Sequence, residues 1–182
     1  MNNILICGSQ KFDDENFVFG MLDALVMSSN VPINGVITSK FSGACYFAKE
    51  WVEYRNSQLD DKNKIKLFNF DFDMQLAKEN TSLYEQLEIP DIILRNDPFF
   101  QKGKESLIKS GASIVLAFPN KEGKLGAATL NIKRFATLAQ IQTMDCSEAF
   151  ELMNSYSRSL EQDMAQEKQK MGLVNHHPKN KF

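Results

Sequence analysis

The stretch "NILICGSQKF" (residues 3–12) places a short, mostly apolar run directly before a glycine and two small polar residues. Four comparable runs follow along the chain: "GVITS" (35–39), "KIKLFNF" (64–70), "ASIVLAF" (112–118) and "AQIQTM" (139–144). These runs are rich in β-branched and aromatic residues and have the length of strands. The pattern therefore predicts about five strands, the first of which ends in a glycine-containing loop.

Segments of helical period separate these runs, namely "DDENFVFGMLDALVMSS" (13–29), "GACYFAKEWVEYRN" (43–56), "MQLAKENTSLYEQL" (74–87) and "DPFFQKGKESLIKSG" (97–111). Strands that alternate with helices are typical of parallel βαβ units, and strands without clean polar alternation indicate a sheet covered on both faces. We therefore expect an α/β fold, a Rossmann-like, doubly wound, mostly parallel sheet of about five strands. Ligands bind such folds beyond the carboxyl ends of the strands.

The last part of the chain differs from the rest in composition. From Ser147 onward it is polar and helix-prone, so we expect a ligand-binding domain over residues 1–146 and a C-terminal helix with a flexible tail over 147–182. Gly172 is expected to stop this helix. Apolar residues recur on one side of this helix, namely Phe150, Met153, Leu160, Met164 and Met171. This stripe either packs along the domain or forms the contact between the subunits of a homo-oligomer. We expect the protein to be a homo-oligomer.

Composition argues against several classes of protein. The formal net charge of -2 and the isoelectric point near 5.7 give no support for nucleic-acid binding, which a local basic patch would still allow. The three cysteines have no CxxC spacing, and the adjacent His176 and His177 have no neighbouring cysteine or carboxylate, so neither a metal nor a cofactor is predicted. The chain has no secretory pattern and no apolar window of membrane-spanning length, so we expect a cytoplasmic protein with no membrane partner.

Four loops contain residues suited to binding a ligand. Small residues follow the first two expected strands, in "GSQKF" (8–12) and "SKFSGA" (39–44), and glycine there allows a ligand to approach the backbone. The loop "PNKEGKLG" (119–126) supplies two glycines and two lysines before a helix, as an anion site would, whereas "RNDP" (95–98) places an arginine before a helix that Asp97 would cap. Each loop alone is also compatible with a structural role, as an ordinary turn, a solvated loop or a surface salt bridge.

Taken together and in this order, "CGSQKF", "SKFSGAC", "LRNDPFF" and "FPNKEGKLGAA" resemble the motifs of the SLOG superfamily, most closely its small YspA-like members. The resemblance covers roughly residues 3–145. It implies a Rossmann-like domain that binds a nucleotide, a nucleotide sugar or an ADP-ribose-type molecule, as a sensor or binding module. The residues expected to contact such a ligand are Gly8, Ser9, Gln10, Phe12, Ser39, Ser42, Gly43, Arg95, Asn96, Pro119, Lys121, Gly123, Lys124, Gly126 and Ala127.

Departures from the family pattern bear on catalysis. The related phosphoribohydrolases of the Lonely guy group carry a catalytic glutamate on the helix after the glycine-rich loop, whereas "GAATLNIKRF" (126–135) has no carboxylate. Cys45 stands where the family has aspartate, and we expect a small buried cysteine there in preference to a reactive thiol. No catalytic residue is therefore predicted. An N-glycosidase acting on nucleoside monophosphates, and an oligomeric module that binds DNA like the DNA-processing protein A group, stay open as alternatives.

Overall fold

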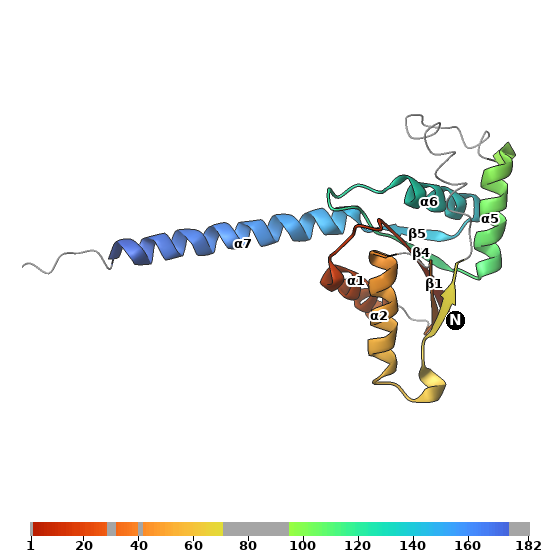
Figure 1. Ribbon diagram of the computed structural model, residues 1–182, viewed down its shortest axis with the longest axis horizontal. Coiled ribbons are helices and arrows are strands. Elements are labelled where there is room, and N and C mark those ends of the chain that lie inside the picture. The colour runs from red at the N-terminus through yellow and green to blue at the C-terminus, as the bar shows by residue number, and fades with distance from the viewer. Residues whose placement is uncertain (1, 29–31, 40–41, 71–94, 175–182) are drawn as a thin grey trace, which may run out of the picture. The chain divides into compact units, whose positions relative to one another are not determined.

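The computed structural model describes residues 2–28, 32–39, 42–70 and 95–174, and the chain divides into two compact units, Met1–Ser147 and Glu148–Phe182. The first unit contains a five-stranded, all-parallel sheet with the order β3-β2-β1-β4-β5 (Figure 1). Its strands are β1 (Asn2–Cys7), β2 (Ile33–Thr38), β3 (Lys66–Asn69), β4 (Ile114–Ala117) and β5 (Gln142–Asp145). The predicted α/β class and the doubly wound, Rossmann-like layout are confirmed.

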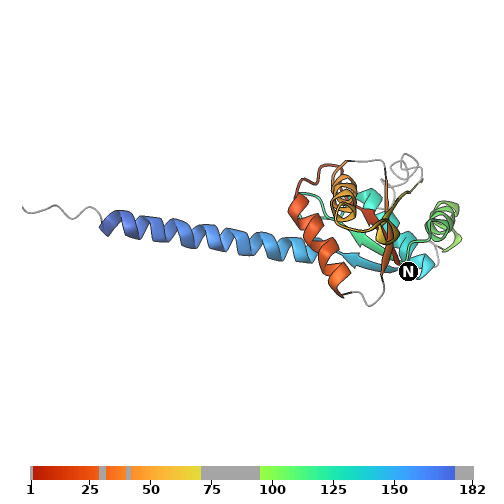
Figure 2. The same cartoon turned by 90° about the horizontal axis from the view of Figure 1, so that it is seen from below.

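Helices cover both faces of the sheet. Figures 1 and 2 show α1 (Glu15–Ser28) and α2 (Ala44–Asn56) on one face, and α5 (Pro98–Ser110) and α6 (Ala127–Ala139) on the other. The chain moves outward from β1 to β2 and β3, then returns to the opposite side of β1 through β4 and β5. The strand order therefore reverses between β1 and β4, which is the position where open α/β sheets form a crevice at their carboxyl edge.

The central strands are buried because they have apolar side chains on both faces. The last four residues of β1 and of β2 are buried, as are the last three of β4, and β1 pairs with β4 in the register Ile4–Ile114 to Cys7–Ala117. On the face covered by α5 and α6, Phe99, Phe100 and Phe135 pack edge to face. These contacts fix both helices on the strands that lead to the crevice.

Local signals in the sequence set the limits of several helices. Asp97 caps α5 by accepting hydrogen bonds from the backbone N–H groups of Phe99 (2.8 Å) and Phe100 (3.4 Å), and Pro98 is its first residue. The same helix ends at Gly111, which has a left-handed φ of 72°. The last expected strand begins later than predicted, at Gln142, because α6 continues to Ala139. The helix expected over 74–87 lies outside the described residues.

The second unit contains the C-terminal helix α7 (Ser147–Val174). The prediction that this helix stops at Gly172 is wrong, since α7 runs two residues further; glycine weakens a helix without forcing it to end. Leu152, Tyr156, Leu160 and Met164 are exposed along it. Self-association through α7 stays a prediction, and the adjacent histidines at 176 and 177 lie outside the described residues.

Candidate functional site

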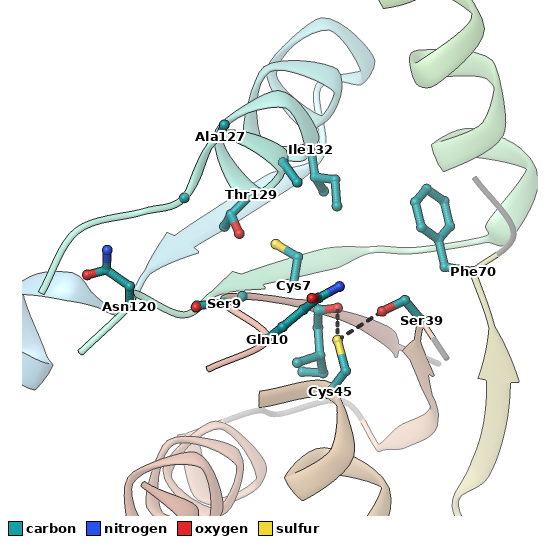
Figure 3. A pocket seen from close by; sticks show the side chains of 14 residues that line it. Cys7, Ser9, Gln10, Ser39, Cys45, Phe70, Asn120, Ala127, Thr129 and Ile132 are labelled. Carbon is teal, nitrogen blue, oxygen red and sulfur yellow. Dashed lines mark hydrogen bonds between the residues drawn. The ribbon is translucent and has the colours of Figure 1, made fainter. Parts of the chain in front are cut away.

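A cavity of about 270 Å³ opens at the carboxyl edge of the sheet, between the end of β1, Cys45 of α2 and the start of α6 (Figure 3). This position agrees with the general rule for ligand sites in doubly wound folds. The volume lies near the lower limit for small-molecule pockets. The residues that line it are Ile6, Cys7, Gly8, Ser9, Gln10, Ser39, Cys45, Phe70, Asn120, Gly126, Ala127, Ala128, Thr129 and Ile132.

One end of the cavity is formed by the first turn of α6. Gly126 precedes this helix in an extended conformation (φ -73°, ψ 160°) and provides no side-chain cap. The first N–H groups of a helix have no partner inside it, and they carry its positive dipole end. Ala127, Ala128 and Thr129 therefore present backbone donors where they line the cavity. This end suits an anion.

Thr129 adds a side-chain group at the same place. The residue is only 2% exposed, yet it lines the cavity, and its hydroxyl points toward Cys7 and Ser9 in Figure 3. No hydrogen bond joins Thr129 Oγ1 to another described residue, and this atom is not among the fully buried side-chain atoms that lack a partner, which are Thr143 Oγ1 and Ser147 Oγ; it is open to the cavity. A hydroxyl on a residue this buried normally has a partner. A ligand oxygen at the start of α6 would supply the missing partner.

Two thiols form the middle of the cavity wall. Cys45 Sγ donates to the Ile6 carbonyl (3.4 Å) and accepts from Ser39 Oγ (3.3 Å), while Cys7 Sγ donates to the Leu116 carbonyl (3.5 Å). Burial raises the pKa of both thiols, that of Cys7 well above its ordinary value. Both side chains are therefore protonated near pH 7 and are poor nucleophiles.

The loop after β1 is held by its own hydrogen bonds and by the start of α2. Ser9 Oγ accepts from the Lys11 N–H (3.2 Å), and the Ser9 carbonyl accepts from the Phe12 N–H (3.2 Å). Ser42 Oγ donates to the Gln10 carbonyl (3.0 Å), and Gly43 passes so close that a Cβ there would lie 2.1 Å from the Ser9 carbonyl oxygen. Ser42 and Gly43 thus position the loop from outside the cavity lining.

Asn120 stabilises the loop between β4 and α6 through its hydrogen bonds. Its Oδ1 accepts from the N–H groups of Glu122 (2.9 Å) and Lys124 (3.0 Å), and its N–H donates to the Lys124 carbonyl (2.7 Å). Gly123 takes the left-handed φ of 79° that this tight turn needs. Lys121 Nζ pairs with Asp13 Oδ2 at 2.5 Å, on the exposed side of the loop. Lys124 is also exposed and outside the lining.

Of the fifteen residues expected to contact a ligand, the structure brings six together around the cavity: Gly8, Ser9, Gln10, Ser39, Gly126 and Ala127. Phe12 is buried against Phe17 and Phe118, and Pro119 is buried as well. Arg95 and Asn96 are exposed and do not line the cavity. Ligand contact by any of the fifteen stays a prediction.

Sequence reasoning did not select several lining residues, chiefly Asn120, Thr129, Phe70, Cys7 and Cys45. A usable signal existed for Thr129, the third residue after the glycine that precedes α6. Asn120 also had one, since asparagine favours such turns. No local signal places Phe70 or Cys7 at the cavity, because strand packing brings them there.

The cavity is electrically neutral in its side chains. None of the described residues that line it is acidic, basic or a histidine, so it offers no carboxylate for acid or base catalysis. No cluster of three metal-ligating side chains occurs in the described part of the chain. Likewise, none of the helices described here combines the length and the apolar character that crossing a membrane would require.

Comparison with protein families, with curated proteins and with solved structures finds no match to this chain. The chemistry of the cavity is therefore the basis on which its function is argued.

Proposed function

We propose that this protein binds a nucleotide or a nucleotide-derived molecule in the cavity at the carboxyl edge of the sheet, with a phosphate group at the start of α6. The observation that carries the proposal is the pairing of a helix N-terminus without a side-chain cap with the hydroxyl of Thr129, which opens onto the cavity from a residue that is only 2% exposed. Both favour an oxyanion, since backbone N–H groups and a hydroxyl donate to it without a basic side chain.

The close packing of the loop after β1 supports the same conclusion. A Cβ added at Gly8 would lie 2.9 Å from Phe118 Cβ, so the backbone of this loop packs directly against the end of β4. Ser9 and Asn120 then provide polar groups at the side of the cavity nearest Thr129, whereas the Gln10 amide lies between Cys7 and Ser39 (Figure 3). The resemblance of these loops to SLOG motifs adds a second, independent argument for a nucleotide-type ligand.

A binding role is favoured over hydrolysis by the neutral lining. Cleavage of an N-glycosidic bond requires a group that stabilises an oxocarbenium-like transition state or moves a proton, which carboxylates supply in glycoside hydrolysis. The described residues around the cavity include no such group, and the thiols there stay protonated. We expect no free base to be released from purine or pyrimidine nucleoside monophosphates, as measured by chromatography.

The test compares Thr129→Val with Thr137→Val on the same helix. Thr137 is exposed and its hydroxyl only contacts the Lys133 carbonyl (3.1 Å), so it serves as the matched control. Loss of one hydrogen bond to a charged group costs about 1.5–3 kcal/mol, so Thr129→Val should weaken binding of AMP or ADP-ribose by a factor of about 10 or more in titration calorimetry. The control should bind as the wild type does.

Wild-type protein with ligand at about 100 times Kd should gain about 2.7 kcal/mol of stability, a rise in melting temperature of about 5–10 °C. The proposal fails if AMP, ADP, ADP-ribose, a nucleotide sugar and inorganic phosphate all leave the melting temperature unchanged. It also fails if Thr129→Val binds these ligands as tightly as Thr137→Val.

A further inference from the structure

The end of the cavity opposite Thr129 has a different chemistry. Figure 3 shows Thr129, Ser9 and Asn120 at one end and Phe70 and Ser39 at the other. Between these ends, the wall is formed by the side chains of Cys7, Cys45 and Ile132. These wall residues are buried, with 3%, 5% and 5% of their surface exposed, and Phe70 has 7%. The cavity is thus polar at one end and apolar along most of the rest.

Apart from the amide of Gln10, which lines the cavity and lies between Cys7 and Ser39 in Figure 3, the side-chain polar groups near the apolar end are already engaged within the protein. Cys45 Sγ donates to the Ile6 carbonyl while it accepts from Ser39 Oγ, and Cys7 Sγ donates to the Leu116 carbonyl. Ser39 Oγ therefore retains acceptor capacity only, and thiols are weak hydrogen-bonding groups. This end can bury a ring. The Gln10 amide beside it belongs to an exposed side chain and can either donate or accept, so it fits the polar edge of any base.

A ribose with its two free hydroxyls is a poor occupant of this end. Each hydroxyl that leaves water without a hydrogen-bond partner costs about 1–3 kcal/mol on the evidence of protein mutations. A planar ring instead gains from burial against sulfur and aromatic side chains, since thiol sulfur is polarizable and Phe70 presents apolar surface. The arrangement of polar and apolar groups along the cavity favours a ligand with an anion at one end and an uncharged ring at the other.

We infer that the cavity holds the nucleobase end of its ligand against Cys7, Cys45 and Phe70, recognises it by burial, and accepts different bases with little discrimination. This inference rests on the proposed function and adds the orientation and the specificity of the ligand. The anion at α6 fixes one end, and the unselective apolar wall receives the other.

The experiment is titration calorimetry of the full chain with AMP, GMP, CMP, UMP, phenyl phosphate and ribose 5-phosphate. The four nucleotides should bind within about 5-fold of one another. Phenyl phosphate, which has the anion and the ring without the sugar, should displace AMP in competition. Ribose 5-phosphate, which has the anion and the sugar without the ring, should bind at least 10-fold more weakly than AMP.

A variant pair tests the wall itself. Cys45→Asp places a charge against the ring and should weaken AMP binding more than 30-fold. The control is Cys146→Val, at a buried cysteine outside the cavity lining, which should bind AMP within about 3-fold of the wild type. Thermal unfolding of each variant reports whether it folds. If Cys45→Asp does not fold, the ligand panel on the wild type decides.

The outcomes separate the two proposals. Equal affinity for ribose 5-phosphate and AMP, or a preference of more than 10-fold for one base, overturns the inference about the ring and leaves phosphate binding at α6 in place. Undiminished AMP binding by a folded Cys45→Asp protein overturns it as well. If AMP, phenyl phosphate and ribose 5-phosphate all fail to bind, both proposals fall.

Discussion

Replacing Gly43 with alanine should destabilise the first unit although the substitution adds a single methyl group. Gly43 precedes α2 with φ 74° and ψ -140°, a region that side chains with a Cβ rarely adopt. The added Cβ would lie 2.1 Å from the Ser9 carbonyl oxygen and 3.1 Å from the Gln10 carbonyl oxygen. Since real Cβ contacts essentially never fall under 3.0 Å, the β1 loop must retreat by about 0.9 Å.

The magnitude follows from two costs. A backbone held in a region reserved for glycine costs about 1–3 kcal/mol. Forcing an extra carbon into packed structure adds about 1–3 kcal/mol. Because the loop can relax in part, we expect Gly43→Ala to lower the free energy of unfolding by about 3 kcal/mol, which corresponds to a fall of about 6–12 °C in melting temperature for a chain of this size.

Urea unfolding followed by the fluorescence of Trp51 measures this change. Trp51 is the sole tryptophan, and it is 1% exposed on α2, so its signal reports the unit that contains the cavity. Gly126→Ala is the matched control, because Gly126 also precedes a helix but has φ -73° and no atom within 4 Å of an added Cβ. The control should stay within about 0.5 kcal/mol of the wild type. Equal unfolding midpoints for the two variants would refute the close approach of Gly43 to the β1 loop.

Two further predictions concern titrating groups. Partial burial opposes ionisation of Asp145, but hydrogen bonds from Lys133 Nζ (2.7 Å) and from a backbone N–H outweigh it and hold the pKa of this carboxyl below its ordinary value. The stabilising contribution of Asp145 is therefore present above about pH 4 and is lost as the pH falls through the folded-state pKa. The difference in urea midpoint between the wild type and Asp145→Asn should shrink on acidification. A constant difference from pH 7 to pH 3 would contradict this prediction. Burial raises the pKa of all three cysteine thiols, that of Cys146 to about 12. Iodoacetamide at pH 8, followed by mass spectrometry, should therefore modify the native chain far more slowly than the urea-unfolded chain. Rapid labelling of any one cysteine in the native chain would contradict this prediction.

The fold could be predicted largely from the sequence because its signals are local. The apolar runs at 3–7 and 35–39 correspond to β1 and β2, and Asp97 with Pro98 marks the start of α5. Each of these signals acts through the backbone of its own segment, by strand propensity or by capping. The alternation of strand and helix then limits the topology to a few arrangements, of which a doubly wound parallel sheet is one.

The site could be predicted only in part because its contents depend on tertiary packing. Glycines after the strands indicate the correct edge of the sheet, and Gly8 and Gly126 do line the cavity. A lysine in a glycine-rich loop suggests an anion site, but Lys121 pairs with Asp13, which lies 108 residues away in sequence. Side chains of long reach find partners that the local sequence does not show, whereas Thr129 is placed by the helix itself.

The neutral lining limits how the cavity can bind a ligand. Donors at a helix N-terminus contribute about 0.3–1 kcal/mol, and up to about 2 kcal/mol when partly buried. Micromolar affinity requires about 8 kcal/mol. The anion end cannot supply this alone, so burial of a ring against Cys45 and Phe70 has to provide much of the remainder. A ligand that lacks either end should therefore bind weakly, and because the side chains carry no charge, its affinity should depend little on salt.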